Sequence, residues 1–259
     1  MILYFVVHSF TDTVFRGNPA GVCPLEEWLD DELMQQIAAE NRLSETAFFV
    51  RKEDHFELRW FTPTIEVDLC GHATLASAYV LFDHLGHEED VATFHTQSGE
   101  LTVWKNGDYL VMDFPSRPAE SIEAPTALIE GLGRAPAEVY QARDYLAIFD
   151  TEQEILDLDP DFAALESLDC TGIIASAPGT EADFVSRFFA PLAGIPEDPV
   201  TGSAHSTLTP FWASRLGKKQ LVAHQVSERG GVLKCTLRDA RVLIAGQAVL
   251  YVKGFMSTD

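Results

Sequence analysis

The chain has 259 residues, of which 46% are hydrophobic and 22% are charged. This is the composition of a globular protein, long enough for one large domain or two of about 130 residues. Asp and Glu number 40 against 18 Lys and Arg, so the formal net charge is -22. Such a charge repels phosphate backbones and anionic lipid headgroups, and nucleic-acid binding and membrane binding are therefore not expected.

Runs of apolar and β-branched residues predict strands, and the first is a buried strand at residues 2–8 rather than a signal peptide. The stretch 16–21, after this strand, is predicted to be a turn-rich loop. Further strands are expected at 46–51, 56–62, 91–96, 100–105, 109–114, 138–142, 145–150, 171–176, 182–190, 221–226, 232–237 and 241–252, and helices at 30–40, 71–84, 125–132, 161–168 and 202–216. Strands outnumber helices and do not alternate with them one for one, which favours an α+β fold with mixed sheets.

A stretch punctuated by prolines lies close to the middle of the chain, at residues 114–125, and is the best candidate for a linker. We therefore expect two half-domains, 1–117 and 118–259, with the last strand able to cross back to the first half.

An internal repeat supports this division. Residues 59–63 (Arg-Trp-Phe-Thr-Pro) are echoed by residues 187–191 (Arg-Phe-Phe-Ala-Pro) at an offset of 128. In each half the aromatic strand is followed by a proline turn, an acid, a glycine (Gly71 or Gly202) and a helix rich in Ala, Ser and Thr. The ordered continuation predicts two homologous halves.

The repeated glycines predict an anion site. A glycine in the first turn of a helix lets a ligand approach the backbone, and the free N–H groups there stabilise negative charge. Two pseudo-symmetric halves would present two such helix starts to a cleft, where a small carboxylate or phosphate would bind. The alternative is that Gly71 and Gly202 only permit close helix packing.

Two side chains of the first half are candidates for proton transfer. Glu45 lies at a junction between a helix and an apolar strand, where partial burial raises a carboxyl pKa toward that of a general base. His72 lies just inside a helix, whose positive end favours neutral imidazole. The alternatives are that Glu45 is a solvated loop acid and that His72 is structural.

Asp68 and Asp198 precede the two glycines, and each could be an acid at a helix N-terminus. Asp198 follows Glu197, so a neighbouring anion site would shift the pKa values of both. Cys70 is at a helix start, where a thiol could act as base or nucleophile. A two-thiol racemase would need a matching cysteine before Gly202, and none is present.

Other chemistries have no motif in the chain. It contains no G-x-x-x-x-G-K-[ST] and no G-x-G-x-x-G, so no nucleotide cofactor is expected. It has no G-x-S-x-G of the serine hydrolases. Four separated cysteines without a C-x-x-C are typical of reduced thiols in a cytoplasmic protein, and the histidines show no metal-ligand spacing, so no metal is expected.

Five ordered motifs together resemble the phenazine-biosynthesis PhzF-like family. They are the segments 15–22 (Phe-Arg-Gly-Asn-Pro-Ala-Gly-Val), 44–48 (Ser-Glu-Thr-Ala-Phe), 61–63 (Phe-Thr-Pro), 70–74 (Cys-Gly-His-Ala-Thr) and 198–204 (Asp-Pro-Val-Thr-Gly-Ser-Ala). The likeness runs nearly from end to end of the chain.

The resemblance implies an α+β fold similar to that of diaminopimelate epimerase. Each half would be a curved, barrel-like mixed sheet around a central helix, with the active site in the cleft. It further implies a homodimer without metal or organic cofactor, and the isomerisation of trans-2,3-dihydro-3-hydroxyanthranilate by a proton shift. The implied catalytic residues are Glu45, as general acid/base, with His72 and Asp198, and the implied substrate-binding residues are Asn18, Gly71, Thr201, Gly202 and Ser203.

We therefore predict a cofactor-independent isomerase of a small carboxylate, with Glu45 carrying the proton. One alternative is an amino-acid epimerase of the diaminopimelate type, which needs two bases on opposite faces of the substrate. The other is an interaction protein that keeps the fold without activity.

Overall fold

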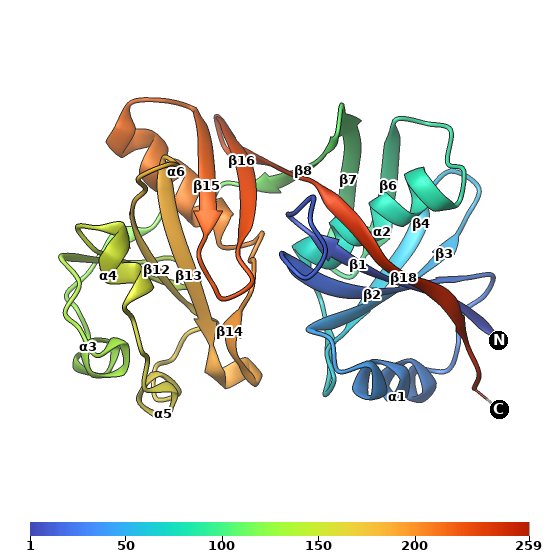
Figure 1. Cartoon of the computed structure of the whole chain (residues 1–259), viewed down its shortest axis with the longest axis horizontal. Coiled ribbons are helices and arrows are strands. Elements are labelled where there is room, and N and C mark those ends of the chain that lie inside the picture. Colours follow the sequence, from blue (N-terminus) through green and yellow to red (C-terminus); the bar gives the residue numbers. More distant parts are fainter. Residues whose placement is uncertain (259) are drawn as a thin grey trace. The chain divides into compact units, whose positions relative to one another are not determined.

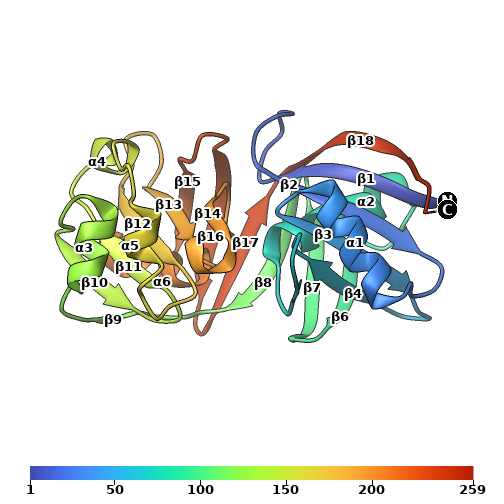
Figure 2. The same cartoon turned by 90° about the horizontal axis from the view of Figure 1, so that it is seen from below.

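The computed structural model describes residues 1–258 and divides into two compact units. Unit 1 comprises Met1–Asp113 and Ala245–Asp259, and unit 2 comprises Phe114–Ile244. The chain leaves unit 1 within strand β8 (Tyr109–Pro115) and returns to it within β17 (Arg241–Gly246) (Figures 1 and 2). No helix among residues 1–258 is long and apolar enough to span a membrane.

Unit 1 is a curved mixed sheet that surrounds one helix (Figures 1 and 2). Its strands pair in the order β18-β1-β2-β3-β4-β6-β7-β8, with parallel pairs at β2–β3 and β4–β6 and antiparallel pairs elsewhere. The bounds are β18 (Ala248–Met256), β1 (Ile2–Ser9), β2 (Asn18–Leu25), β3 (Glu45–Arg51), β4 (Phe56–Phe61), β5 (Glu66–Val67, beside β4), β6 (Val91–Thr96), β7 (Gly99–Asn106), α1 (Asp31–Asn41) and α2 (Gly71–His84).

Helix α2 is the enclosed helix, and its bounds are those predicted. Its first eight residues are all buried, as expected of a helix with apolar or small residues on every side. The buried hydroxyls of Thr74 and Ser77 donate to the carbonyls of Cys70 and Ala73 at 2.6 and 2.8 Å. These bonds let polar side chains enter the core without an unsatisfied group.

Unit 2 repeats this plan. Its strands pair in the order β9-β10-β11-β12-β13-β15-β16, with parallel pairs at β11–β12 and β13–β15. The bounds are β9 (Glu120–Ser121), β10 (Glu138–Gln141), β11 (Tyr145–Ile148), β12 (Ile173–Pro178), β13 (Phe184–Ala190), β14 (Ile195–Asp198, beside β13), β15 (Gln220–Gln225), β16 (Gly231–Arg238), α3 (Thr126–Leu132), α4 (Glu152–Leu156), α5 (Phe162–Leu165), the 3-10 turn η1 (Pro191–Ala193) and α6 (His205–Leu216).

The two units share one topology. The run β2-β3-β4-β6-β7 and the run β11-β12-β13-β15-β16 have the same succession of parallel and antiparallel pairs. The repeat also preserves a bidentate ion pair: Arg59 Nε lies 2.7 Å from Glu66 Oε1, and Arg187 Nε lies 2.7 Å from Glu197 Oε1. The predicted α+β fold of two pseudo-symmetric halves, each a mixed sheet around a helix, is confirmed.

The predicted loop at 16–21 is wrong from Asn18 onward, because Asn18 begins strand β2. Pro19 is tolerated as the second residue of this strand, near its start. Gly21 is required in its interior, since a Cβ there would lie 2.9 Å from Thr46 Oγ1 and 3.1 Å from the ring of Tyr4. This segment rich in Gly and Pro is therefore a strand within the sheet, where the side chains of Thr46 and Tyr4 leave no room for a Cβ at residue 21.

Helix α6 begins at His205, three residues later than predicted. Gly202 and Ser203 form a tight turn instead, in which the N–H groups of His205 and Ser206 donate to the carbonyls three residues earlier. Farther along, Pro210 lacks the N–H that would bond the carbonyl of Ser206, and that carbonyl accepts from the N–H of Arg117 at 2.9 Å.

Candidate functional site

Three side chains of unit 1 converge at the buried end of helix α2. Glu45 is the first residue of β3, Asn18 is the first residue of β2, and His72 is the second residue of α2. The parallel pairing of β2 with β3 puts Ala20 opposite Glu45 and so brings the starts of both strands to the same edge. All three are buried, with the side chain of Glu45 retaining 12% exposure.

His72 is the centre of this cluster. Its Nδ1 lies 3.1 Å from Asn18 Nδ2, and its Nε2 lies 3.2 Å from Glu45 Oε2, at ion-pair distance but without the alignment of a hydrogen bond. Burial lowers the pKa of His72 to about 3, so the ring is neutral near pH 7. Because the amide of Asn18 donates to Nδ1, the ring proton is on Nε2 and faces the carboxylate of Glu45.

Cys70 completes the cluster. It is the N-cap residue of α2, and its thiol Sγ, which is not in a disulfide, lies 3.5 Å from Nδ1 of His72. One ligand atom each from Glu45, Cys70 and His72 lies within 4.8 Å of the others. The donor types are oxygen, sulfur and nitrogen, a set that also suits a metal ion.

The start of α2 also offers backbone donors. The first helical hydrogen bond runs from the N–H of Thr74 to the carbonyl of Cys70, at 3.2 Å. The N–H groups of Gly71, His72 and Ala73 precede it and have no carbonyl within the helix to accept from them. They give the helix end that carries His72 the character of an anion site.

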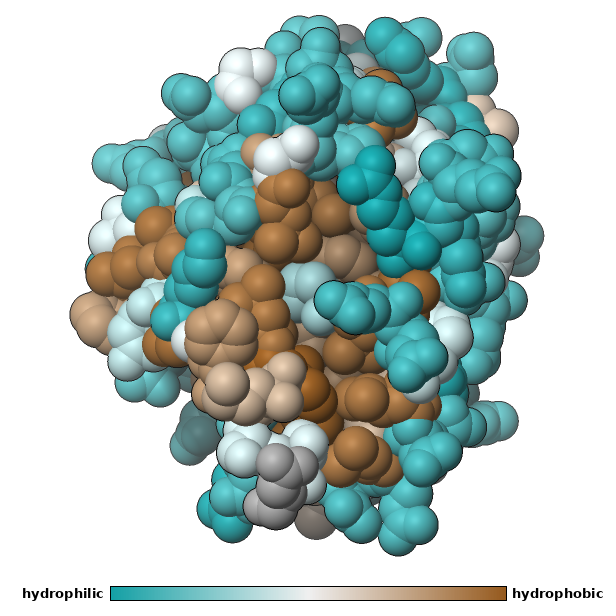
Figure 3. Space-filling model, turned by 90° about the vertical axis from the view of Figure 1, so that its right-hand side faces the viewer, coloured by the Kyte–Doolittle hydropathy of each residue, from teal (hydrophilic) through white to brown (hydrophobic). Residues whose placement is uncertain are grey.

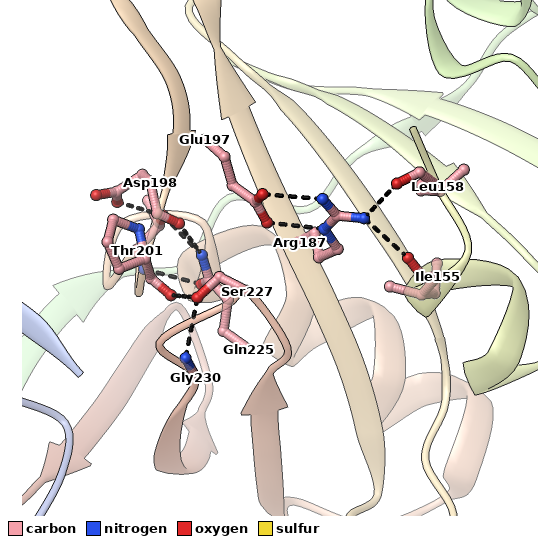
Figure 4. Close-up of polar contacts among 10 residues, drawn as sticks. Ile155, Leu158, Arg187, Glu197, Asp198, Thr201, Gln225, Ser227 and Gly230 are labelled. Atoms are coloured by element: carbon pink, nitrogen blue, oxygen red, sulfur yellow. Dashed lines mark hydrogen bonds and ion pairs between the residues drawn. The ribbon is translucent and has the colours of Figure 1, made fainter. Parts of the chain in front are cut away.

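A second cluster lies in unit 2, in the turn between β14 and α6 (Figure 4). Thr201 Oγ1 donates to Asp198 Oδ2 at 2.5 Å. Gln225, the last residue of β15, accepts from the N–H of Thr201 at 2.8 Å and donates through Nε2 to the carbonyl of Asp198 at 2.8 Å and to Thr201 Oγ1 at 3.2 Å. A side chain that is 1% exposed thereby fixes the turn on both sides.

The same turn is held at its helical end. His205, fully buried, donates from Nδ1 to the carbonyl of Thr201 at 2.8 Å, and burial lowers its pKa to about 4. Gly202 and Ser203 follow Thr201 in the tight turn before α6, and Ser203 is partly exposed. The fold thus places Asp198, Thr201, Gly202 and Ser203 in one short segment of unit 2.

The predicted site residues therefore fall into two groups. Asn18, Glu45, Gly71 and His72 are together in unit 1, and the four predicted residues of unit 2 are together in the turn before α6. Neither Asp68 nor Asp198 caps its helix, because the N-cap residues are Cys70 and Ala204.

Gln225 was missed by the sequence analysis. Its three hydrogen bonds reach residues 24 and 27 positions away, which no local pattern reveals. The repeat could have indicated it, since Gln97 lies 128 residues earlier, at the offset that relates Arg59 to Arg187. Gln97 donates to Glu66 Oε1 at 2.9 Å, but on the surface.

The fold class follows from comparison with solved structures. The crystal structure of a PhzF-family protein from Enterococcus faecalis superposes with a TM-score of 0.96 at 46% identity, covering 98% of each chain. A probable proline racemase from Agrobacterium radiobacter has a TM-score of 0.67 at 12% identity, covering 100% of this chain and 94% of its own, and shares the fold alone.

The family follows from the sequence. A family model described as phenazine biosynthesis-like protein (PhzC-PhzF) matches residues 7–254, and the chain belongs to this family. An uncharacterized isomerase from Pseudomonas aeruginosa is 53% identical over 96% of each chain. The human phenazine biosynthesis-like domain-containing protein is 40% identical over 98% of each chain. The predictions of the family and of an enzyme of the isomerase class are confirmed.

Proposed function

We propose that the protein isomerises a small carboxylate by moving a proton between two of its carbons, with Glu45 as the only acid/base and no metal or organic cofactor. The substrate class is that of trans-2,3-dihydro-3-hydroxyanthranilate. The observation that carries the proposal is the position of Glu45 Oε2, 3.2 Å from Nε2 of a neutral, buried His72.

In the proposed reaction, the Glu45 carboxylate removes a proton from one carbon and returns it to another on the same face of the substrate. The Nε2–H of His72 stabilises the carboxylate while it is charged, and a small rotation would align the two groups. Because His72 stays neutral, it does not protonate Glu45 permanently. The low exposure of both side chains strengthens their interaction and limits exchange with water.

The substrate anion needs hydrogen-bond donors that are already held in position, so that binding does not require the protein to rearrange. In unit 1 we assign this role to the backbone N–H groups around Gly71, with Asn18 as a further polar contact. The candidates in unit 2 are the backbone N–H groups around Gly202 and Ser203, with Thr201 beside them. Asp198, held by Thr201 and Gln225, is assigned the substrate's amino or hydroxyl hydrogens, because a carboxylate accepts them. Such fixed contacts would hold both reacting carbons within reach of one base.

Deuterium exchange tests the proposal. In heavy water, the enzyme with dihydrohydroxyanthranilate should place deuterium on carbon and yield the isomerised ring. Glu45→Gln should reduce kcat by about 10²- to 10⁴-fold, because general acid/base catalysis contributes that much. Glu53→Gln, which changes an exposed acid beyond the same strand, should keep activity. Unaltered turnover in Glu45→Gln would refute the assignment.

One observation favours the epimerase as a second candidate. Cys70 puts a thiol 3.5 Å from His72, so the cluster contains a second group able to carry a proton. This function predicts exchange at the α-carbon of an amino acid, lost in both Cys70→Ser and Glu45→Gln. The isomerase predicts that Cys70→Ser retains proton transfer.

We further propose that the protein is a homodimer. Figure 3 looks onto the end of unit 1 that carries both termini and shows apolar residues gathered there. Met1 and, in β18, Phe255 are exposed by 90% and 69%. Contiguous exposed apolar surface of this kind is typical of an interface. Light scattering after size exclusion should give twice the chain mass, and Phe255→Asp should shift it to the monomer.

A further inference from the structure

Cys70 has no part in the proposed proton shift, yet it lies inside the Glu45–His72 cluster. Its Sγ is 3.5 Å from Nδ1 of His72, while Glu45 Oε2 is 3.2 Å from Nε2. Among residues 1–258, this is the one set of three His, Cys, Asp or Glu side chains whose ligand atoms converge within 4.8 Å.

The spacing of these donors suits zinc. Zn²⁺ binds thiolate sulfur at about 2.3 Å, histidine nitrogen at about 2.0 Å and carboxylate oxygen at about 2.0–2.2 Å, with tetrahedral geometry. Ligand atoms of such a site are therefore separated by about 3–4 Å. Glu45 Oε2 is already 3.2 Å from Nε2 of His72, and one ligand atom from each of the three residues lies within 4.8 Å of the others, so binding requires side-chain adjustment rather than movement of the backbone.

The charges in the cluster are also favourable. A Cys70 thiolate and a Glu45 carboxylate together balance the charge of the ion. The net charge of -22 raises the concentration of cations near the protein.

We propose that Glu45, Cys70 and His72 bind Zn²⁺ and that the bound ion inhibits the enzyme. Cys70 loses its proton to solvent on binding, and the fourth coordination position is left to water. The binding itself is independent of the proposed function. The inhibition rests on it, since a carboxylate that ligates zinc no longer removes a proton from carbon.

The metal takes one nitrogen of the ring, and we assign Nε2, which faces Glu45. The ring proton then moves to Nδ1, and the Asn18 side chain, 3.1 Å away, accepts it by turning its amide oxygen to the ring. A ligating histidine that donates its other N–H to an oxygen is the usual arrangement in zinc sites.

Binding is measured on the full chain without substrate. Metal-free protein is titrated with Zn²⁺ against a chromophoric chelator, and with Co²⁺ to record the thiolate-to-metal charge-transfer band. We expect one ion per chain, release of about one proton, and binding weakened at least 100-fold in Cys70→Ser. Cys170→Ser, at a partly exposed cysteine of unit 2, is the matched control and should bind as the unaltered protein does.

Circular dichroism confirms that Cys70→Ser is folded, and Glu45→Gln, which keeps the size of the side chain, serves as a second ligand variant. Equal Zn²⁺ affinity of Cys70→Ser and the unaltered protein would overturn the site. So would a loss of affinity in Cys170→Ser equal to that in Cys70→Ser.

Inhibition is measured by the carbon-deuterium assay. If the protein turns over substrate, one equivalent of Zn²⁺ should abolish exchange, and a chelator should restore it. Full exchange with the site saturated would overturn the inhibition. Zinc bound as predicted by a protein without isomerase activity would refute the proposed function and leave the metal site standing.

Discussion

His72 and His205 are two buried histidines whose rings make different contacts. His72 is the second residue of α2, and His205 is the first residue of α6. Burial lowers the pKa of each, and one ring nitrogen of each makes a hydrogen bond. His205 donates to the backbone carbonyl of Thr201, which is a structural contact. His72 contacts three side chains that all carry or donate protons, and on this ground we propose that it, rather than His205, acts in the reaction.

The pKa of His72 predicts a pH dependence of stability. Its folded pKa is about 3 and that of an unfolded histidine is about 6.5, so between these values the unfolded chain binds more protons. The free energy of unfolding should therefore fall as the pH is lowered from 7 toward 4, by up to about 1.4 kcal/mol per pH unit for this group. Urea titrations of His72→Gln should show a shallower fall than those of His95→Gln, whose side chain is 49% exposed. Equal slopes would contradict the buried, neutral assignment.

Gln225 and Gln97 form a matched pair for measuring what burial adds. Gln225→Leu should leave the N–H of Thr201 and the carbonyl of Asp198 without a partner, at about 1–3 kcal/mol for each buried group. Gln97→Leu removes a surface bond to Glu66 and should change stability by less than about 0.5 kcal/mol. Thermal unfolding compares the two. A loss in Gln97→Leu as large as in Gln225→Leu would refute the role of burial.

At the scale of elements, the sequence predicted the most where the pattern was local. The bounds of α2 and the strand carrying Arg59 and its echo at Arg187 follow from hydrophobic runs and the repeat. Strand β2 did not follow from a local pattern, because the need for a glycine at residue 21 comes from the side chain of Thr46 on the neighbouring strand. The candidate site was predicted as a set of residues through motif resemblance, whereas the contacts among them depend on strand pairing that no single segment encodes.

The repeated Arg–Glu pair predicts unequal effects in the two units. Arg187 also donates to the carbonyls of Ile155 and Leu158, at 3.2 and 2.7 Å, and so ties α4 to β13, and its side chain is 13% exposed. Arg187→Met should cost about 1–3 kcal/mol more than Arg59→Met, because the carbonyl of Leu158 loses its donor, whereas the partner carboxylates Glu197 and Glu66 are equally exposed, at 22% and 23%. Arg59→Met should cost about 1 kcal/mol or less, since Arg59 pairs nearer the surface. Chemical denaturation measures both, and equal losses would contradict this account.

At the scale of the whole molecule, unit 1 is assembled from both ends of the chain. Strand β18 pairs with β1 from Ile2–Met256 to Ser9–Ala248, and the carbonyl of Gln247 accepts from the N–H of Phe10 at 2.8 Å. Unit 2 is one continuous segment. The two units should therefore respond differently to the loss of the C-terminal strand.

Deleting residues 245–259 should expose one edge of β1 and open the core around Phe10 while leaving unit 2 folded. Hydrogen exchange should show lost amide protection over β1 and β2 and retained protection over β12 and β13. The control is a chain truncated after Met256, which keeps every β1–β18 pair. Protection of β1 that persists without β18 would show that this strand does not complete the unit.

The pairing of Ile2 with Met256 has a consequence for biosynthesis. A chain emerging from the ribosome displays β1 long before its partner strand β18 has been synthesised, whereas unit 2 is complete before β18 begins. Since domains fold as units as they are synthesised, the second half of the molecule should reach its native state first. Unit 1, which carries Glu45 and His72, should close only after β18 has been synthesised and can pair with β1.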